Sequence, residues 1–220
     1  MFCDALLCID DLLPKHAALN MATDEALLWR PEFDRPTLRH YRWQRPSVSL
    51  GYFTRHVTVP ARCAGWDLVR RWTGGGIVEH QDDFTYALLL PPKYPRLRVE
   101  AIYWEVHAAL AATLRTHGLP VHQSGEPDVR LSDACFGRAV RADLKWEGRK
   151  VAGAAIRRHR KGVLLQGSVQ GLPLPGGLLA DFAAALARNV SPSSLTDEVL
   201  AAARILEREK YGAPAWTLRY

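Results

Sequence analysis

The chain has 220 residues, of which 48% are hydrophobic and 24% charged, a balance that is typical of globular proteins. It excludes a disordered, collagen-like or coiled-coil chain. The apolar stretch from Ala5 to Ile9 is too short to cross a bilayer, and Asp10 and Asp11 follow it directly. We therefore expect neither a signal peptide nor a transmembrane helix, and we expect a cytoplasmic protein.

Hydrophobic periodicity and turn residues predict strands in both halves of the chain and four helices. Strands are predicted over 6–9, 37–41, 47–52, 67–72, 84–90, 127–131, 142–146, 150–155 and 163–169. Helices are predicted over 14–28, 99–117, 178–188 and 195–210. For the first helix the predicted apolar positions are Leu19, Ala22, Ala26 and Trp29.

The last predicted helix has Ser194 as its N-cap and Asp197 in its first turn. No repeat and no linker interrupts the chain. Many strands with segregated helices indicate one α+β domain over 1–220, ending in a helical segment at about 178–220.

The formal net charge is +6, and the basic residues are rich in arginine and cluster between Arg157 and Lys161. A positive face favours acidic partners, and nucleic acid, nucleotide phosphates or an acidic carrier protein would all satisfy it. A basic surface that serves only solubility explains the same charge. The composition alone leaves these alternatives open.

The four cysteines show neither CxxC spacing nor a zinc pattern, so no metal site is predicted. Without a secretion signal we expect free thiols in a reducing compartment, and most free cysteines are buried apolar residues. Cys135 lies near Arg138 and Arg141, and positive neighbours lower the pKa of a thiol and favour a nucleophile. Local spacing does not separate this cysteine from a structural one.

Three consecutive glycines follow Arg70-Arg71-Trp72-Thr73. Glycines suit a backbone that passes close to a ligand, or N–H groups that converge on an anion. Arg70 and Arg71 add charge that suits a phosphate or a carboxylate. The segment matches neither a Walker A loop nor a Rossmann fingerprint, and a flexible hairpin connection explains it equally well.

A second informative stretch begins at Lys150, which precedes Val151, Ala152 and Gly153. A lysine that enters a strand of small residues either projects into a site or ends a hairpin in solvent. In a site, its point charge would suit an acyl carbonyl oxygen or a phosphate.

Taken together, five segments of the chain resemble the biotin/lipoate protein ligase family, on the side of the lipoate–protein ligases and octanoyltransferases. They are 20–28 (NMATDEALL), 49–53 (SLGYF), 70–76 (RRWTGGG) with His80 and Tyr86, 148–153 (GRKVAG) and 164–168 (LLQGS). They occur in the family's order and cover about 15–170. The resemblance implies an α+β fold, a mixed β-sheet with packed helices, as in class II biotin/lipoate ligase catalytic domains.

The resemblance also implies site residues. The arginine–glycine loop would lie over the acyl chain or acyl-adenylate, and Lys150 would contact the acyl carbonyl. The substrate-binding residues implied in this way are Arg71, Thr73, Gly74, Gly75, Gly76, His80, Gly153 and Ala154.

Two chemistries occur in the family. In the first, a Cys135 thiolate takes octanoyl from the thioester of acyl carrier protein and passes it to a lysine of a lipoyl domain, without a cofactor. In the second, lipoate is activated with ATP and Mg as lipoyl-AMP and then transferred. The pair Cys135-Phe136 looks like the sequence of one octanoyltransferase branch. Gly76 looks more like the ligases, because this octanoyltransferase branch often has an arginine at the position of Gly76.

Two further features favour the transferase hypothesis. The ligases often have asparagine at the position of Ala142, and many need an accessory domain, whereas 50 residues follow Gln170 here. The expected partners are acyl carrier protein and lipoyl domains, both typically acidic, with octanoate or lipoate as the acyl group; neither a membrane nor nucleic acid is expected. The family commonly has a histidine between the positions of Gln166 and Gly167, which this chain lacks, so a non-catalytic binding protein on the same fold stays open as a third hypothesis.

Overall fold

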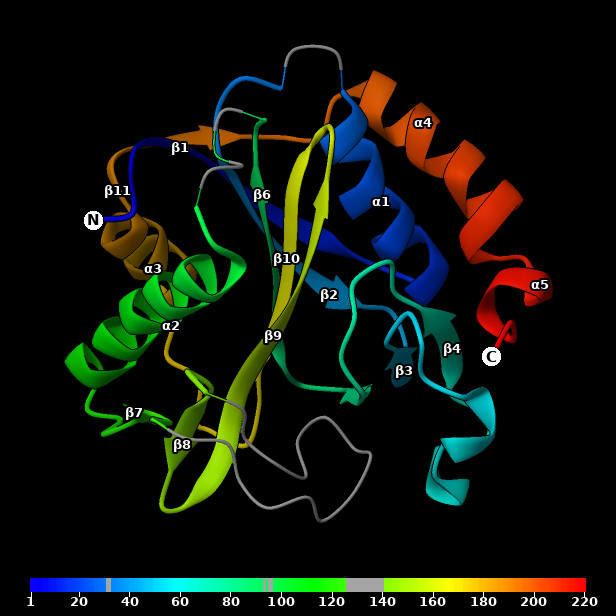
Figure 1. Ribbon diagram of the computed structural model, residues 1–220, viewed down its shortest axis with the longest axis horizontal. Helices are drawn as coiled ribbons and strands as arrows, with labels where there is room; N and C mark the ends of the chain where they lie inside the picture. Colours follow the sequence, from blue (N-terminus) through cyan, green and yellow to red (C-terminus); the bar gives the residue numbers. More distant parts are fainter. Residues whose placement is uncertain (31–32, 93, 95–96, 126–140) are drawn as a thin grey trace.

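The computed structural model describes residues 1–30, 33–92, 94, 97–125 and 141–220, which form two β-sheets flanked by helices (Figure 1). The large sheet has eight strands in the order β11-β1-β2-β6-β10-β9-β8-β7. Its strands are β1 (Cys3–Lys15), β2 (Thr37–Trp43), β6 (Phe84–Leu90), β7 (His122–Gln123), β8 (Leu144–Trp146), β9 (Arg149–His159), β10 (Gly162–Val169) and β11 (Ala187–Ser193). The pairs β1–β2 and β1–β11 are parallel and the others antiparallel, which confirms the mixed sheet.

Helices cover both faces of the large sheet (Figure 1). On one face, α2 (Val99–Thr116) and α3 (Leu178–Leu186) pack with Leu88 and Leu165 in one apolar cluster. On the other, α1 (Ala17–Trp29) and α4 (Asp197–Leu206) pack with Leu89 and Leu164 in a second cluster. Successive strand residues point to opposite faces, which explains why the central strands read as continuous apolar runs.

The small sheet has the order β4-β3-β5, formed by β4 (Asp67–Arg70), β3 (Ser47–Leu50) and β5 (Ile77–His80). The predicted strand over 67–72 therefore ends at Arg70, and β5 was not predicted. Residues 51–66 connect β3 to β4 and residues 71–76 connect β4 to β5, so the glycine run lies at one end of the small sheet.

Helix α1 differs from its predicted amphipathic pattern. Trp29, expected on the buried face, is 37% exposed, whereas Asp24 and Glu25 are buried. The reason is that α1 lies between the large sheet and the C-terminal segment, and each of them supplies a polar partner for the buried carboxylates of α1. Arg39 donates to Asp24 Oδ1 at 2.6 Å, and Lys210 donates to Glu25 Oε2 at 2.6 Å.

The C-terminal segment is only partly helical, which corrects the prediction over 178–220. Helix α3 ends at Leu186, and the next seven residues form the edge strand β11, whose exposed side chains and Pro192 give no strand pattern. Thr196, not Ser194, caps α4 by accepting a hydrogen bond from the backbone N–H of Val199. A π-helical turn (Glu207–Tyr211) and α5 (Pro214–Thr217) follow.

The predicted strand over 127–131 lies outside the described residues. Within the described part of the chain, no helix has the length and apolar character needed to cross a membrane.

Candidate active site

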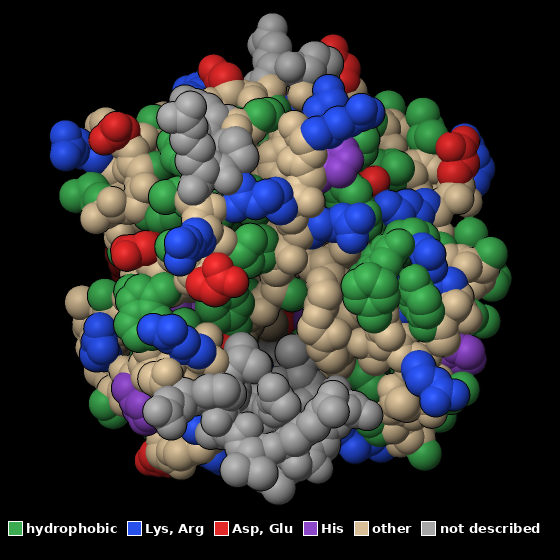
Figure 2. All heavy atoms as spheres, viewed as in Figure 1, with side chains coloured by type: hydrophobic (Ala, Val, Ile, Leu, Met, Phe, Trp, Pro, Cys, Tyr) green, Lys and Arg blue, Asp and Glu red, His purple; other side chains and the backbone are tan. Residues whose placement is uncertain are grey.

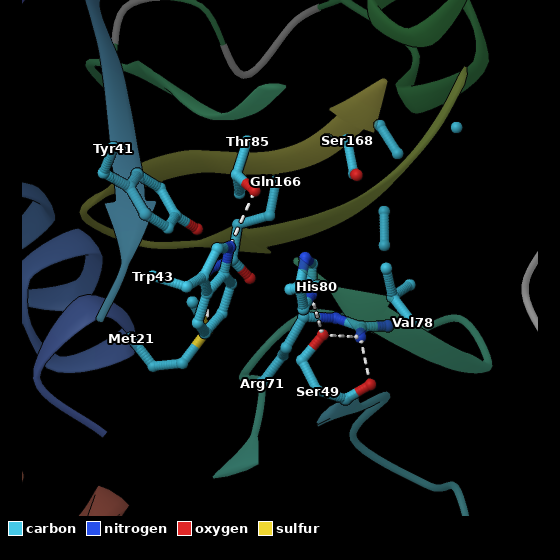
Figure 3. A pocket seen from close by; sticks show the side chains of 14 residues that line it. Met21, Tyr41, Trp43, Ser49, Arg71, Val78, His80, Thr85, Gln166 and Ser168 are labelled. Atoms are coloured by element: carbon cyan, nitrogen blue, oxygen red, sulfur yellow. Dashed lines mark hydrogen bonds between the residues drawn. The ribbon is translucent and has the colours of Figure 1, made fainter. Parts of the chain in front are cut away.

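A pocket lies where the two sheets meet, beside the N-terminal half of α1 (Figure 3). The large sheet contributes small residues from β9 and β10 and aromatic ones from β2, and the small sheet contributes polar ones. The lining residues are Met21, Tyr41, Trp43, Ser49, Arg71, Val78, His80, Thr85, Gly153, Ala154, Ala155, Gln166, Gly167 and Ser168. Apolar walls with a few convergent polar groups are typical of a small-molecule site.

Lys150 lies next to this pocket rather than in solvent. Its side chain is 4% exposed, and its Nζ lies 2.7 Å from Asp143 Oδ2. It packs against Gly153, where an added Cβ would come within 2.6 Å of Lys150 Cε. Because Gly153 lines the pocket, this glycine lets the lysine approach the pocket wall closely.

Helix α2 supports Lys150 through the carboxylate. The Tyr103 hydroxyl donates to Asp143 Oδ1 and accepts from the backbone N–H of Ala154 at 2.8 Å. Burial and the neighbouring charge of Asp143 raise the pKa of Tyr103 well above its ordinary value, so its hydroxyl keeps the proton that it donates. We call Lys150, Asp143 and Tyr103 the lysine cluster.

His107, also on α2, holds the backbone that precedes the carboxylate. Its Nδ1 lies 2.7 Å from the carbonyl oxygen of Ala142, which can only accept, so Nδ1 donates. Burial lowers the pKa of His107 from 6.5 to about 4, and the ring is therefore neutral near pH 7. Ala142 has a φ of 71°, in the region that disfavours side chains with a Cβ, and this hydrogen bond helps to hold it there.

Residues 71–76, which we call the glycine loop, fold back onto β3. Arg71 Nη1 donates to Ser49 O and Oγ, both at 2.7 Å, and Nη2 donates to the carbonyl oxygens of Gly74 and Gly76, both at 3.0 Å. At Gly51 an added Cβ would lie 1.8 Å from the carbonyl oxygen of Gly75. The loop therefore owes its position to Arg71 and to the missing side chain at Gly51.

Arg70 does not face the pocket, which corrects the expectation that it supplies charge for an anion. Its buried guanidinium donates to backbone carbonyls of residues 51, 52, 54, 216 and 217, at 2.7–3.2 Å. It thereby ties the C-terminal segment to the small sheet.

A chain of hydrogen bonds continues from the glycine loop into the sheet. Ser49 Oγ lies 2.7 Å from His80 Nε2, and His80 Nδ1 lies 2.8 Å from Asp83 Oδ2 (Figure 3 shows the first of these). Thr85 and Ser168 also donate to Asp83 Oδ2, both at 2.6 Å. Burial raises the pKa of Asp83, but the charge and hydrogen bond of His80 and these hydroxyls outweigh it, so the pKa is lowered and Asp83 is a carboxylate.

A second chain joins the loop to α1. The Thr73 hydroxyl donates to Gln166 Oε1 at 2.7 Å, and Gln166 Nε2 donates to Asp24 Oδ2 at 2.7 Å. Gln166 and Gly167 pair in continuous register with Ala87 and Tyr86 of β6. These contacts fix β10, α1 and the glycine loop around one end of the pocket.

The residues singled out in the sequence fall into three groups. Arg71, His80, Gly153 and Ala154 line the pocket, Thr73 and the three glycines belong to the adjoining loop, and Lys150 lies behind Gly153. Cys135 lies outside the described residues. The sequence analysis assigned no role to the polar groups that hold these residues, namely Ser49, Asp83, Tyr103, His107 and Asp143. The signals were the place of Ser49 in one of the segments that carry the resemblance and the three-residue spacing from His80 to Asp83. No group of three or more His, Cys, Asp or Glu that could hold a metal ion occurs among the described residues.

Comparisons with known proteins agree with this architecture. Octanoyltransferase LipM of Oceanobacillus iheyensis is 36% identical over 163 residues, which cover 70% of this chain and 59% of that protein. Octanoyltransferase LipM of Symbiobacterium thermophilum is 32% identical over 258 residues, which cover 91% of this chain and 93% of that protein. A structure of the bipartite lipoate protein ligase and its E2 lipoyl domain from Thermoplasma acidophilum shares the fold, with a TM-score of 0.70, 21% identity and coverage of 99% and 97%. The family model of the lipoyl protein ligase A/B catalytic domain matches residues 16–171, and the chain belongs to that family.

Proposed function

We propose that the protein moves an octanoyl group from the thioester of acyl carrier protein to a lysine of a lipoyl domain, through a thioester on Cys135. The observation that carries this proposal is a buried lysine next to a pocket with apolar walls. Met21, Tyr41 and Trp43 offer apolar surface for an acyl chain, and Lys150 offers charge beside it. The names of the similar proteins support octanoyl rather than another acyl group.

In the first step, the Cys135 thiolate attacks the thioester carbonyl, the bond from carbon to the carrier's sulfur breaks, and the carrier leaves as a thiolate. In the second step, the amine of the acceptor lysine attacks the new thioester, an amide forms and the Cys135 thiol is released. Lys150 would stabilise the oxyanion of both tetrahedral intermediates. Neither step needs ATP, because a thioester is converted first into a thioester and then into a more stable amide.

The other three cysteines are poorly suited to this chemistry. Burial, with help from the charges of Asp4 and Asp10, raises the pKa of Cys3 and of Cys8 to about 11. Burial and the charge of Glu79 also raise the pKa of Cys63. All three therefore stay protonated near pH 7, and a thiol is a far weaker nucleophile than a thiolate.

The test is the intact mass of the purified protein after incubation with octanoyl–acyl carrier protein. We expect one octanoyl group on the wild type and on Cys8→Ala, and none on Cys135→Ala. The adduct should disappear when a lipoyl domain is added, as the domain gains the same mass. An adduct that survives in Cys135→Ala would refute the thioester on this residue.

The ligase alternative, with ATP and Mg and a lipoyl-AMP intermediate, predicts a different product. It requires pyrophosphate release that depends on both lipoate and ATP, with no acyl adduct on the protein. The third alternative, a non-catalytic binding protein, requires that neither the adduct nor pyrophosphate forms.

A further inference from the structure

A group of cations and aromatic rings lies beyond the pocket, and the steps above do not use it. We call it the basic–aromatic surface; it consists of Arg157, Lys161, Lys210 and Arg219 with Trp29, Trp72 and Trp216. Arg157 lies 4.5 Å and Lys210 4.6 Å from the ring centroid of Trp72, Arg219 5.0 Å from that of Trp216, and Lys161 5.9 Å from that of Trp29. All four distances are within the range of cation–π contacts.

The charges of this surface are not balanced. Glu25 pairs with Lys210 at 2.6 Å, but Arg157, Lys161 and Arg219 form no ion pair with a carboxylate of the described residues. Burial lowers the pKa of Lys210, and although Glu25 opposes this, Arg157 and Arg219 lower it further, so the cations are close enough to repel one another. An anionic partner would relieve this repulsion.

The surface is accessible and has the composition of a binding interface. Lys161 and Arg219 are exposed and Trp29 is 37% exposed, whereas Trp72 is buried. Tryptophan, tyrosine and arginine are the residue types most enriched among the residues that dominate binding energy. Figure 2 shows Lys and Arg side chains near the end of the β9–β10 hairpin, beside hydrophobic side chains, on the face that also carries a hollow.

The basic–aromatic surface begins where the pocket ends. Arg157 lies two residues after Ala155 on β9, so both side chains project from one face of the strand, and Ala155 lines the pocket. Arg157 Nη1 also donates to the carbonyl oxygen of Trp72, in the glycine loop, at 3.2 Å. A protein bound here would therefore lie against the rim of the pocket.

We propose that the basic–aromatic surface docks the lipoyl domain that accepts the acyl group. This inference rests on the proposed function, which supplies the partner: an acidic domain with one lysine to be acylated. Charge complementarity would steer the domain to the pocket and fix its orientation, and it would act on the encounter rate more than on the chemistry. Trp29 and the partly exposed Trp216 would supply the apolar part of the contact.

The test separates docking from chemistry with the double charge reversal K161E/R219E. Wild type and variant are first acylated with octanoyl–acyl carrier protein and then mixed with rising concentrations of a purified lipoyl domain. We expect the concentration for half-maximal transfer to rise at least tenfold, with the maximal rate and the acylation step unchanged. Transfer by the variant should also depend less on salt concentration, because fewer positive charges of the enzyme attract the acidic lipoyl domain.

The control is R115E/R188E, which makes the same change in charge at exposed arginines on α2 and β11 and should behave as wild type. The proposal is overturned if the half-maximal concentration is unchanged, or if the control shows an equal effect. It is also overturned if only acylation slows, and that result would assign the surface to acyl carrier protein. A direct binding titration with the lipoyl domain needs no turnover, so it tests docking even if no acyl-enzyme forms. Tighter binding of a single-stranded oligonucleotide than of the lipoyl domain in that titration would also overturn it.

Discussion

Arg71 and Lys150 both adjoin the pocket, but they come from different sheets and have different partners. Arg71, at the end of the small sheet, donates to Ser49 and to two carbonyl oxygens of its own loop. Lys150, on the large sheet, pairs with the buried carboxylate of Asp143. The arginine thus acts on the shape of the glycine loop, whereas the lysine places a charge beside the pocket.

This difference shows that a cation next to a pocket need not be there for the ligand. Arg71 is a positioning residue by its contacts, since its guanidinium fixes the backbone over β3. Lys150 is a candidate catalytic residue, since an ammonium group that is held by one carboxylate can also donate to a developing oxyanion. Substitutions in the lysine cluster should therefore change the rate of chemistry, and substitutions in the glycine loop should change stability and substrate fit.

The largest expected effect is that of Lys150→Met. We expect acyl transfer to fall roughly 100- to 1,000-fold, as it does when one oxyanion donor is removed. The measurement is the single-turnover rate with octanoyl–acyl carrier protein and a lipoyl domain. Arg149→Met removes the exposed cation next to it and should retain the wild-type rate.

Removal of Lys150 alone also leaves Asp143 buried without its cation, which can cost about 3–5 kcal/mol of stability. The double variant K150M/D143N removes both charges and should recover most of that stability without recovering activity. If the double variant regains transfer, the loss in the single variant is due to misfolding, and Lys150 does not stabilise the oxyanion.

The second effect concerns the pH range over which the lysine cluster stays in place. His107 has a pKa of about 4 in the folded protein against an ordinary value of 6.5, so between these values the unfolded chain binds more protons than the folded one. Stability therefore falls as the pH falls from 6.5 to 4, by about 3 kcal/mol for this one group. In His107→Asn, whose amide can still donate to Ala142, this part of the pH dependence should be absent.

The measurement is the free energy of unfolding in urea at pH 7.5, 5.5 and 4.5. His122→Asn, at an exposed position, is the control and should follow the wild type at each pH. Parallel curves for wild type and His107→Asn would show that the buried ring does not titrate as the structure requires.

The two regions also differ in how far the sequence predicts them. The glycine loop is contiguous, and the sequence shows Arg70 and Arg71 shortly before its glycines, although only the contacts of Arg70 show that it binds the C-terminal segment instead of a ligand. The lysine cluster joins β9 to Asp143 and to Tyr103 on α2, and no local pattern connects residues so far apart. The same limit applies to the fold. The sequence predicts apolar central strands such as β6 with their bounds. The exposed edge strand β11 and the polar buried face of α1 depend instead on partners elsewhere in the chain.

The smallest expected effect is that of Gly51→Ala, which tests the role of the glycine loop. In Gly51→Ala the new methyl group would lie 1.8 Å from the Gly75 carbonyl oxygen, so the loop must move away from β3. We expect a loss of about 1–3 kcal/mol in the free energy of unfolding, typical of overpacking, and a higher KM for the acyl donor with a nearly unchanged kcat. Gly176→Ala, outside the glycine loop, is the control, because its added Cβ meets nothing within 4 Å and should leave stability and KM close to wild type. If Gly51→Ala instead lowers kcat as much as Lys150→Met does, the glycine loop takes part in the chemistry, and the division between a loop that shapes the pocket and a lysine that acts on the carbonyl is wrong.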